Sequence, residues 1–469
     1  MTVTSNQARR RARGVALIGL DCATPELLFE RFAEDMPTLS ALRARSLWGP
    51  LESTAPPNSI PAWPCMLSGR TPGELGVYGF RNRTDRSYDG IRFSTSRAIG
   101  VPRLWDLLGS AGLDSIVLGV PQTYPPSPVR GCMVSCFLTP GTDAQFTFPA
   151  ALRDEVQQVT GGYMLDVTDF RSNDKDRVAQ QVFDMTEQRF ALARHLATTR
   201  PWDLLAVVDM GPDRLHHGFW RHYDPEHPRH EPGNRWTTLF RDYYRALDRH
   251  LAGLLEALPD DTDVVVASDH GAQPMLGGFC VNEWLVQEGL LVLTEPPSRP
   301  TPIAKAGVDW PRTLVWGDGG HYARLFLNVE GREPLGAVPV REYETVRQHL
   351  IDRLEALPDD QGRPMGTRVL RPEELYPEVR GVAPDLIVYV GNLRWRAVGS
   401  LGLGRGLYTF DNDTGPDDAN HAEQGVFMLA GDGLATGRRD DLSIYDVAPT
   451  LQSLFGLPRQ QGQRGRVLT

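Results

Sequence analysis

The chain has 469 residues, 41% of them hydrophobic, so it can form one large globular domain with insertions or two or three smaller domains. Its formal net charge of −10 argues against a general binder of nucleic-acid polymers, which needs a basic surface to neutralise phosphates. No stretch of about 18 apolar residues is present in the sequence, so we expect no membrane partner.

The N-terminal residues 1–13 are expected to form a flexible tail. Basic residues precede an apolar run at 14–20, as in a signal peptide, but the run is short and no cleavage site of small residues follows it. The five cysteines include no CxxC pair and indicate no disulfide framework. We therefore expect a cytoplasmic protein.

Short apolar runs alternate with longer amphipathic segments along the chain. The runs expected as strands are 14–20, 115–120, 203–209, 263–269, 323–329, 385–390 and 425–431. The segments expected as helices are 25–36, 176–196, 239–258 and 342–357. This alternation predicts an α/β fold in which helices flank a mostly parallel central sheet.

Two segments break this regular alternation. Residues 71–175 and 272–322 are richer in proline, glycine and polar residues and show weaker periodicity. We predict that both are insertions that cap a site, within a single domain that spans residues 14–458.

Ser59, in the stretch "NSIPAW", lies near the start of a predicted short helix. Serine is a preferred N-cap residue, because its side-chain oxygen accepts a hydrogen bond from a free backbone N–H. The same N–H groups can also position a nucleophilic hydroxyl against an anionic substrate. The segment alone leaves both interpretations open.

Acidic residues follow three of the predicted strands. Asp21 follows the run 14–20, Asp209 ends the run 203–209, and Asp269 is followed at once by His270. The carboxyl ends of parallel strands lie at one edge of a sheet, where α/β proteins bind their ligands. This placement indicates a metal site, although we interpret Asp209 as structural.

Two further segments supply metal-ligand residues. In "DRLHHGFW", Asp213 and His217 are four residues apart, so a helix would place both on one face. In "DDANHAEQG", His421 precedes a predicted strand. Mixed carboxylate and imidazole ligation suits zinc or manganese, and six such ligands suit two ions. Two neighbouring ions can clamp both oxygens of an in-line phosphoryl displacement and can activate a hydroxyl such as that of Ser59.

Six segments in this order resemble the alkaline phosphatase superfamily, and most closely its type I phosphodiesterase/nucleotide pyrophosphatase branch. They are "GLDCATPEL", "NSIPAW…SGRTPGELGVYGF", "DRLHHGFW", "SDHG", "NHAEQGVF" and "YDVAPTLQSLFGLP". The resemblance implies an alkaline-phosphatase-like three-layer sandwich with cap insertions. It also implies one ion, usually zinc, held by Asp213, His217 and His421. A second ion would be held by Asp21, Asp269 and His270, beside Ser59 as the nucleophile.

The function that this resemblance implies is hydrolysis of a phosphodiester or phosphoanhydride bond in a small phosphorylated metabolite, such as a nucleotide, through a phospho-Ser59 intermediate. The sequence leaves alternatives open: a phosphomonoesterase, a phosphonate ester hydrolase or a phosphomutase of the same superfamily, or a non-catalytic metal-binding relative. Six residues near the motifs are candidates for substrate contacts: Asn58, Arg81, Arg83, His216, Trp220 and His321.

Overall fold

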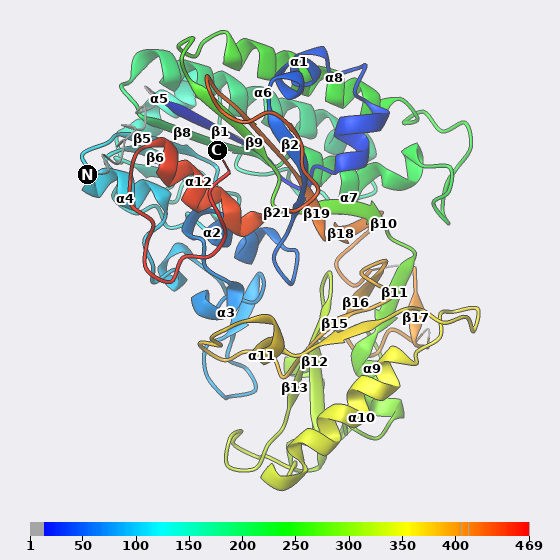
Figure 1. The fold of residues 1–469 in the computed structure, drawn as a ribbon. Coiled ribbons are helices and arrows are strands. Elements are labelled where there is room, and N and C mark those ends of the chain that lie inside the picture. Colours follow the sequence, from blue (N-terminus) through cyan, green and yellow to red (C-terminus); the bar gives the residue numbers. More distant parts are fainter. Residues whose placement is uncertain (1–13, 405, 411, 469) are drawn as a thin grey trace.

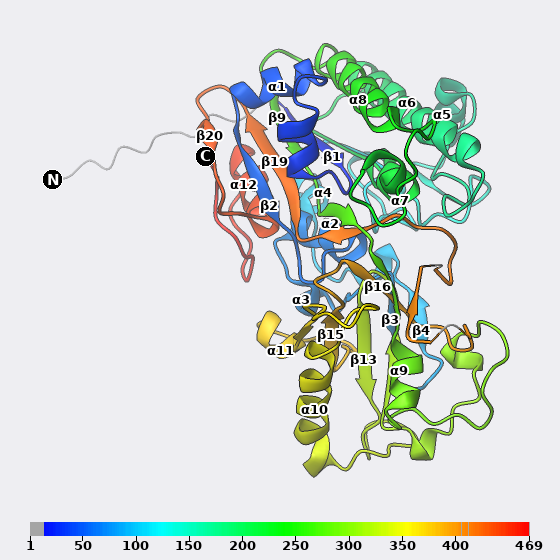
Figure 2. The same cartoon turned by 90° about the vertical axis from the view of Figure 1, so that its right-hand side faces the viewer.

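The computed structural model describes residues 14–404, 406–410 and 412–468, so the predicted tail at 1–13 lies outside the described residues. These residues form two lobes (Figures 1 and 2). The large lobe contains both ends of the described chain, and the small lobe is built mainly from residues 277–409. Among the described helices, none has both the length and the apolar character that crossing a membrane requires.

A central sheet, ten-stranded within the described residues, forms the middle layer of the large lobe. In sheet order its strands are β20 (Gly437–Arg438), β2 (Leu47–Glu52), β19 (Gln424–Ala430), β9 (Asp263–Ala267), β1 (Val15–Leu20), β8 (Leu204–Asp209), β5 (Ser115–Leu118), β6 (Gly131–Val134) and β7 (Thr147–Phe148), and β21 (Leu442–Ser443) also pairs with β2. The strands from β9 to β6 are parallel, whereas β19 runs antiparallel to both of its neighbours.

The parallel strands are apolar along their length because helices cover both faces of the sheet. Every residue of β1 and β8 is buried. On one face lie α1 (Pro37–Ala44), α5 (Leu152–Thr160), α6 (Lys175–Thr199) and α8 (Leu239–Leu255), and on the other lie α2 (Ser59–Ser68), α4 (Leu104–Ser110) and α12 (Val447–Leu454) (Figure 1). The predicted α/β fold with a central sheet between helical layers is confirmed.

The small lobe has its own hydrophobic core, which includes Trp316 and Leu354. It contains an antiparallel sheet of β12 (Val315–Asp318), β13 (Ala323–Leu327), β15 (Leu386–Tyr389) and β14 (Arg368–Leu370), and a second sheet of β16 (Trp395–Val398), β11 (Gly277–Cys280) and β17 (Tyr408–Thr409). Helices α9 (Val281–Gln287), α10 (Tyr343–Glu355) and α11 (Pro372–Leu375) accompany them. The predicted strands at 323–329 and 385–390 therefore form, but in this sheet rather than in the central one.

The two segments predicted as caps have different places in the fold. Within 71–175, strands β5, β6 and β7 belong to the central sheet, so this part is not a cap. The same segment also contains α3 (Pro72–Leu75) and the hairpin of β3 (Arg81–Arg83) and β4 (Ile91–Phe93). Most of 272–322 lies in the small lobe. Residues 25–36, predicted as a helix, are helical over Glu26–Arg31 (η1), because Phe32 leaves the helical conformation at φ −111° and ψ 14°.

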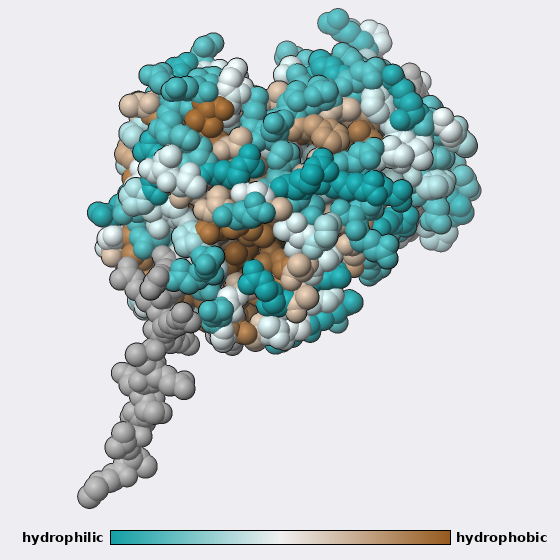
Figure 3. Space-filling view, turned by 90° about the horizontal axis from the view of Figure 1, so that it is seen from above, coloured by the Kyte–Doolittle hydropathy of each residue, from teal (hydrophilic) through white to brown (hydrophobic). Residues whose placement is uncertain are grey.

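Two antiparallel strands join the lobes where the chain enters and leaves the small lobe. They are β10 (Gly271–Pro274) and β18 (Ala419–Ala422), which place Ala272 opposite His421. The face of the large lobe seen in Figure 3 is mostly hydrophilic and carries smaller apolar patches.

Gly19 in β1 provides a test of the packing between the sheet and α2. A Cβ atom there would lie 2.4 Å from Trp63 Cη2 and 2.7 Å from Val208 Cγ2. We expect Gly19→Ala to lower the free energy of unfolding by about 1–3 kcal/mol, as overpacked cores do, in a urea titration. Gly100→Ala is the control, because a Cβ atom there would meet nothing within 4 Å, and its effect should stay within about 0.5 kcal/mol. Equal stability of the two variants would contradict this account.

Candidate active site

The predicted metal-binding residues meet at the carboxyl edge of the central sheet, beside the junction of the lobes. Asp21 follows β1, and Asp269 and His270 follow β9. Asp213 and His217 lie on the first two turns of α7 (Gly211–Tyr223), which follows β8. His421 is in β18. All six side chains are buried, with at most 2% of each residue exposed.

Ser59 is the first residue of α2, and its hydroxyl faces this cluster. The Oγ atom lies 3.2 Å from Asp21 Oδ1 and 3.1 Å from His270 Nε2. The N-cap of α2 is Asn58, whose Oδ1 accepts a hydrogen bond from the Ile60 N–H at 3.3 Å. The geometry therefore assigns the capping role to Asn58, the predicted substrate contact, and leaves the Ser59 hydroxyl directed at a carboxylate and an imidazole.

The three histidines of the cluster share one arrangement. Each Nδ1 atom lies close to an oxygen: 2.6 Å from Asp417 Oδ1 for His217, 3.1 Å from the Gly271 carbonyl for His270, and 2.8 Å from the Pro57 carbonyl for His421. An Nδ1–H that donates to oxygen leaves Nε2 with its lone pair. Histidines that bind metals are held in this way by their second ring nitrogen.

The Nε2 atoms and the carboxylates face one another. His217 Nε2 and His421 Nε2 lie 3.5 Å and 3.8 Å from Asp213 Oδ1. His270 Nε2 lies 3.2 Å from Asp269 Oδ2 and 3.8 Å from Asp21 Oδ1. Lone pairs that converge on carboxylate oxygens at these distances repel one another unless a cation or a proton lies between them.

The second oxygen of each carboxylate is held from behind by a protein donor. Trp63 Nε1 donates to Asp21 Oδ2 at 2.8 Å, Arg214 Nη1 donates to Asp213 Oδ2, and the Cys22 N–H donates to Asp269 Oδ1 at 3.4 Å. The buried Asp269 Oδ2 has no hydrogen-bond partner among the described residues. Carboxylates that accept a hydrogen bond from the protein through one oxygen and direct the other oxygen toward the cluster are suited to binding divalent cations.

Burial dominates the electrostatics of the cluster. It raises the pKa of Asp21 well above its usual range, and the negative charge of Asp269 raises it further. Burial also raises the pKa of Asp269 and lowers those of His270 and His421. These shifts disfavour the charged forms of the side chains, and a bound cation would oppose the shifts of the carboxylates.

The pKa values of Asp213 and His217 are shifted in the opposite directions, because each residue has a partner of opposite charge. Burial raises the pKa of Asp213, but the positive charges of His217 and Arg214 bring it well below its usual value. Burial lowers the pKa of His217, but Asp417 and Asp213 raise it to about 9.

His321 lies in the same cluster, although the sequence offered it only as a substrate contact. It belongs to the turn between β12 and β13 in the small lobe. Its ring stacks on that of His421, with the centroids 3.7 Å apart and an angle of 15° between the planes. Ligand atoms of His217, His321 and His421 lie within 4.8 Å of one another. His321 is a single histidine in a loop, and no feature of the sequence around it indicates that its ring lies in this cluster.

Three other predicted substrate contacts point away from the cluster. Arg83 is buried in the small lobe, with its guanidinium 3.4 Å from Glu333 Oε1 and over the Trp316 ring. His216 Nε2 lies 2.7 Å from Tyr244 OH, and Trp220 Nε1 donates to Asp224 Oδ2. His216 and Trp220 pack against α8 because they lie on another side of α7 from Asp213 and His217. The fourth, Arg81, is half-exposed and pairs with Asp318 at 3.1 Å.

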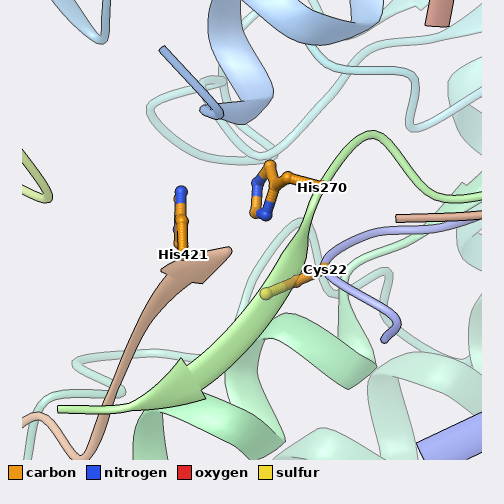
Figure 4. A group of neighbouring side chains, drawn as sticks. All are labelled: Cys22, His270 and His421. Carbon is orange, nitrogen blue, oxygen red and sulfur yellow. The ribbon is translucent and has the colours of Figure 1, made fainter. Parts of the chain in front are cut away.

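Two residues near the cluster were missed by the sequence analysis. Asp417 accepts from His217 through Oδ1, and its Oδ2 is 2.8 Å from Arg171 Nε and 2.9 Å from Arg396 Nη1. Cys22 points toward His270 and His421, which lie side by side (Figure 4). Cys22 follows Asp21 in the chain and Asp417 precedes His421, but only the fold shows where the two side chains point.

The profile of the type I phosphodiesterase/nucleotide pyrophosphatase family matches residues 15–417. Murine ectonucleotide pyrophosphatase/phosphodiesterase 5, an inactive variant in complex with AMP, is similar in structure, with a TM-score of 0.57 and 12% identity over 97% of each chain. The human protein of that name has a TM-score of 0.56 and 12% identity over 96% of this chain and 97% of its own. No curated protein sequence matches significantly.

The chain belongs to the type I phosphodiesterase/nucleotide pyrophosphatase family, and the resemblance drawn from its motifs is confirmed. It is accordingly a hydrolase of phosphoric esters. The structural neighbours show that the fold is shared over nearly the full length of the chain.

The bond from Trp63 to Asp21 can be tested by its contribution to stability. In Trp63→Phe the buried Asp21 Oδ2 loses the donor at 2.8 Å, and an unsatisfied buried acceptor costs about 1–3 kcal/mol. Trp105→Phe is the matched control, because Trp105 is equally buried and its Nε1 has no hydrogen-bond partner among the described residues. Chemical denaturation of the metal-free proteins should show the larger loss for Trp63→Phe. Equal losses would mean that the indole contributes by packing alone.

Proposed function

We propose that this member of the type I phosphodiesterase/nucleotide pyrophosphatase family is a two-metal hydrolase that acts through a phospho-Ser59 intermediate. Its substrate would be a phosphodiester or phosphoanhydride of a small metabolite. The observation that carries this proposal is the position of the Ser59 hydroxyl, 3.2 Å from Asp21 Oδ1 and 3.1 Å from His270 Nε2. A nucleotide is favoured as substrate because a structural neighbour is described in complex with AMP.

The family resemblance divides the donor residues into two sets, although the ligand atoms of Asp21, Asp213 and His270 also lie within 4.8 Å of one another. Asp213 Oδ1 lies near the Nε2 atoms of His217 and His421, and these three residues would hold one ion. Asp21, Asp269 and His270 lie beside Ser59 and would hold the other. When bound, two zinc or manganese ions supply positive charge that stabilises a serine alkoxide and the phosphoryl oxygens.

The residues of the chain account for the remaining parts of the reaction. The Ser59 Oγ atom attacks phosphorus, and the bond from phosphorus to the leaving oxygen breaks. Asp21 Oδ1 and His270 Nε2 contact the Ser59 hydroxyl in this structure. Because both residues would hold an ion, the Ser59 proton would pass to water, and solvent would protonate the leaving oxygen. Water then attacks phosphorus, the bond from phosphorus to Ser59 Oγ breaks, and the serine is regenerated as the phosphate monoester leaves. Because the site is buried, each polar group acts in an environment of low dielectric constant, where it stabilises developing charge more than in water.

The nucleophile can be tested with Ser59→Ala. We expect kcat/KM for bis(p-nitrophenyl) phosphate, measured on protein loaded with zinc or manganese, to fall roughly 1,000-fold or more, because the attacking oxygen is removed. Ser68→Ala is the control: Ser68 is buried at the other end of α2, and its hydroxyl donates to the Pro64 carbonyl. Wild-type activity of Ser59→Ala would instead indicate direct attack by water.

The substrate class is tested in the same assay. The proposal expects faster turnover of the diester than of p-nitrophenyl phosphate, and release of nucleoside monophosphate from a nucleotide diester. A metal-loaded protein that turns over no phosphate ester would contradict the proposal.

Asp417→Asn tests whether Asp417 orients His217 as a ligand. The substitution keeps the size of the side chain but removes the carboxylate that holds the Nδ1–H at 2.6 Å. We expect zinc affinity, measured by competition with a chromogenic chelator, to fall about 10- to 100-fold. Asp440→Asn, on an exposed carboxylate, should leave the affinity unchanged. Unchanged affinity in Asp417→Asn would mean that the orientation of His217 does not matter for the ion.

A further inference from the structure

An imidazole from the small lobe reaches the cluster that the large lobe builds. His321 lies between β12 and β13, whereas His217 is on α7 and His421 is on the strand that leads back to the large lobe. The centroid of the His321 ring lies 3.7 Å from that of His421 and 5.2 Å from that of His217. Only 8% of His321 is exposed, so the ring is enclosed between the lobes.

The hydrogen bonds of Asn420 define the state of the His321 ring. Asn420 Nδ2 donates to the carbonyl oxygens of His321 and Leu393, at 2.8 Å and 2.7 Å. Its Oδ1 must therefore be the atom that faces His321 Nδ1, at 2.7 Å. An amide oxygen only accepts, so Nδ1 carries the proton and Nε2 keeps its lone pair.

This is the same arrangement as in the three predicted histidine ligands. In His217, His270 and His421 too, Nδ1 lies against an oxygen and Nε2 is the ring nitrogen directed at the carboxylates of the cluster. Any buried histidine needs an acceptor for its ring N–H, and here that acceptor fixes which nitrogen keeps the lone pair. The ligand atoms of His217, His321 and His421 also lie within 4.8 Å of one another, close enough for one ion.

We propose that His321 is an additional ligand of the ion that Asp213, His217 and His421 would hold. This inference rests on the two-metal function proposed above. The ion then joins the small lobe to the large one, since its ligands come from the β12–β13 turn, α7 and β18. Catalytic zinc sites commonly have three protein ligands, and a fourth is compatible with the five-coordinate state that zinc also adopts.

The experiment measures metal binding by the full-length protein. His321→Ala removes the ring, and His321→Gln keeps a neutral polar side chain of similar length in case the smaller residue disturbs folding. His349→Ala is the matched control, because His349 is an exposed histidine on α10 in the same lobe. Each protein is titrated with zinc against a chromogenic chelator, and the visible absorption of the cobalt-loaded form is recorded as a report on coordination.

We expect both His321 variants to bind one of the two zinc ions at least about tenfold more weakly, with the other ion unaffected. The cobalt spectrum should change in both variants and not in His349→Ala. Wild-type affinity and an unchanged spectrum in His321→Gln would overturn the inference, whatever the effect on turnover. Failure of the wild-type protein to bind two ions would overturn both proposals. Binding of two ions without hydrolysis of any phosphate ester would overturn the proposed function alone, and the affinities would still decide the role of His321.

Discussion

Three aspartates are buried together at one edge of the central sheet, and the charge of their carboxylates must be balanced there. Asp21, Asp213 and Asp269 are each at most 2% exposed, and taking an unpaired carboxylate out of water is costly. The protein anchors one oxygen of each with Trp63, Arg214 or a backbone N–H, and directs the other at imidazole nitrogens. Arg214 and His217 offset the charge of Asp213, whereas burial leaves the pKa values of Asp21 and Asp269 raised. The cation proposed above would supply positive charge beside these carboxylates and beside the Ser59 hydroxyl.

The junction between the lobes determines how the imidazoles are arranged. Strands β10 and β18 carry the chain into and out of the small lobe, and their antiparallel pairing places His421 opposite Ala272, two residues after His270. The rings of His270 and His421 consequently stack, with centroids 3.8 Å apart. His321 extends the stack from the small-lobe side. Any change in the angle between the lobes would move His321 relative to His217, so the small lobe contributes a side chain to the cluster.

Charge around the cluster is organised through Asp417. Its carboxylate contacts His217 on one side and two arginines, Arg171 and Arg396, on the other. Together with His217, these arginines lower the pKa of Asp417 in spite of its burial, so that it stays a carboxylate and can hold the His217 N–H. The arginines come from segments 225 residues apart in the chain, one before α6 and one in β16. An ordered Asp417 therefore depends on both lobes being folded.

Much of this site follows from local sequence. Apolar runs that end in aspartate place carboxylates at one sheet edge, and a four-residue spacing puts Asp213 and His217 on one face of α7, because strand and helix geometry repeat over short distances. The fold class and the convergence of the candidate residues could be predicted on that basis, and the family from the resemblance of six motifs. The directions of side chains that contact residues distant in the sequence could not be predicted in this way. Arg83 turned into the small-lobe core, His216 and Trp220 turned toward α8, and His321 entered the cluster because contacts between distant segments decide these orientations. Nor does composition reveal that residues 323–329 and 385–390 form a separate sheet: a buried strand is apolar in either core, and only tertiary packing selects its neighbours.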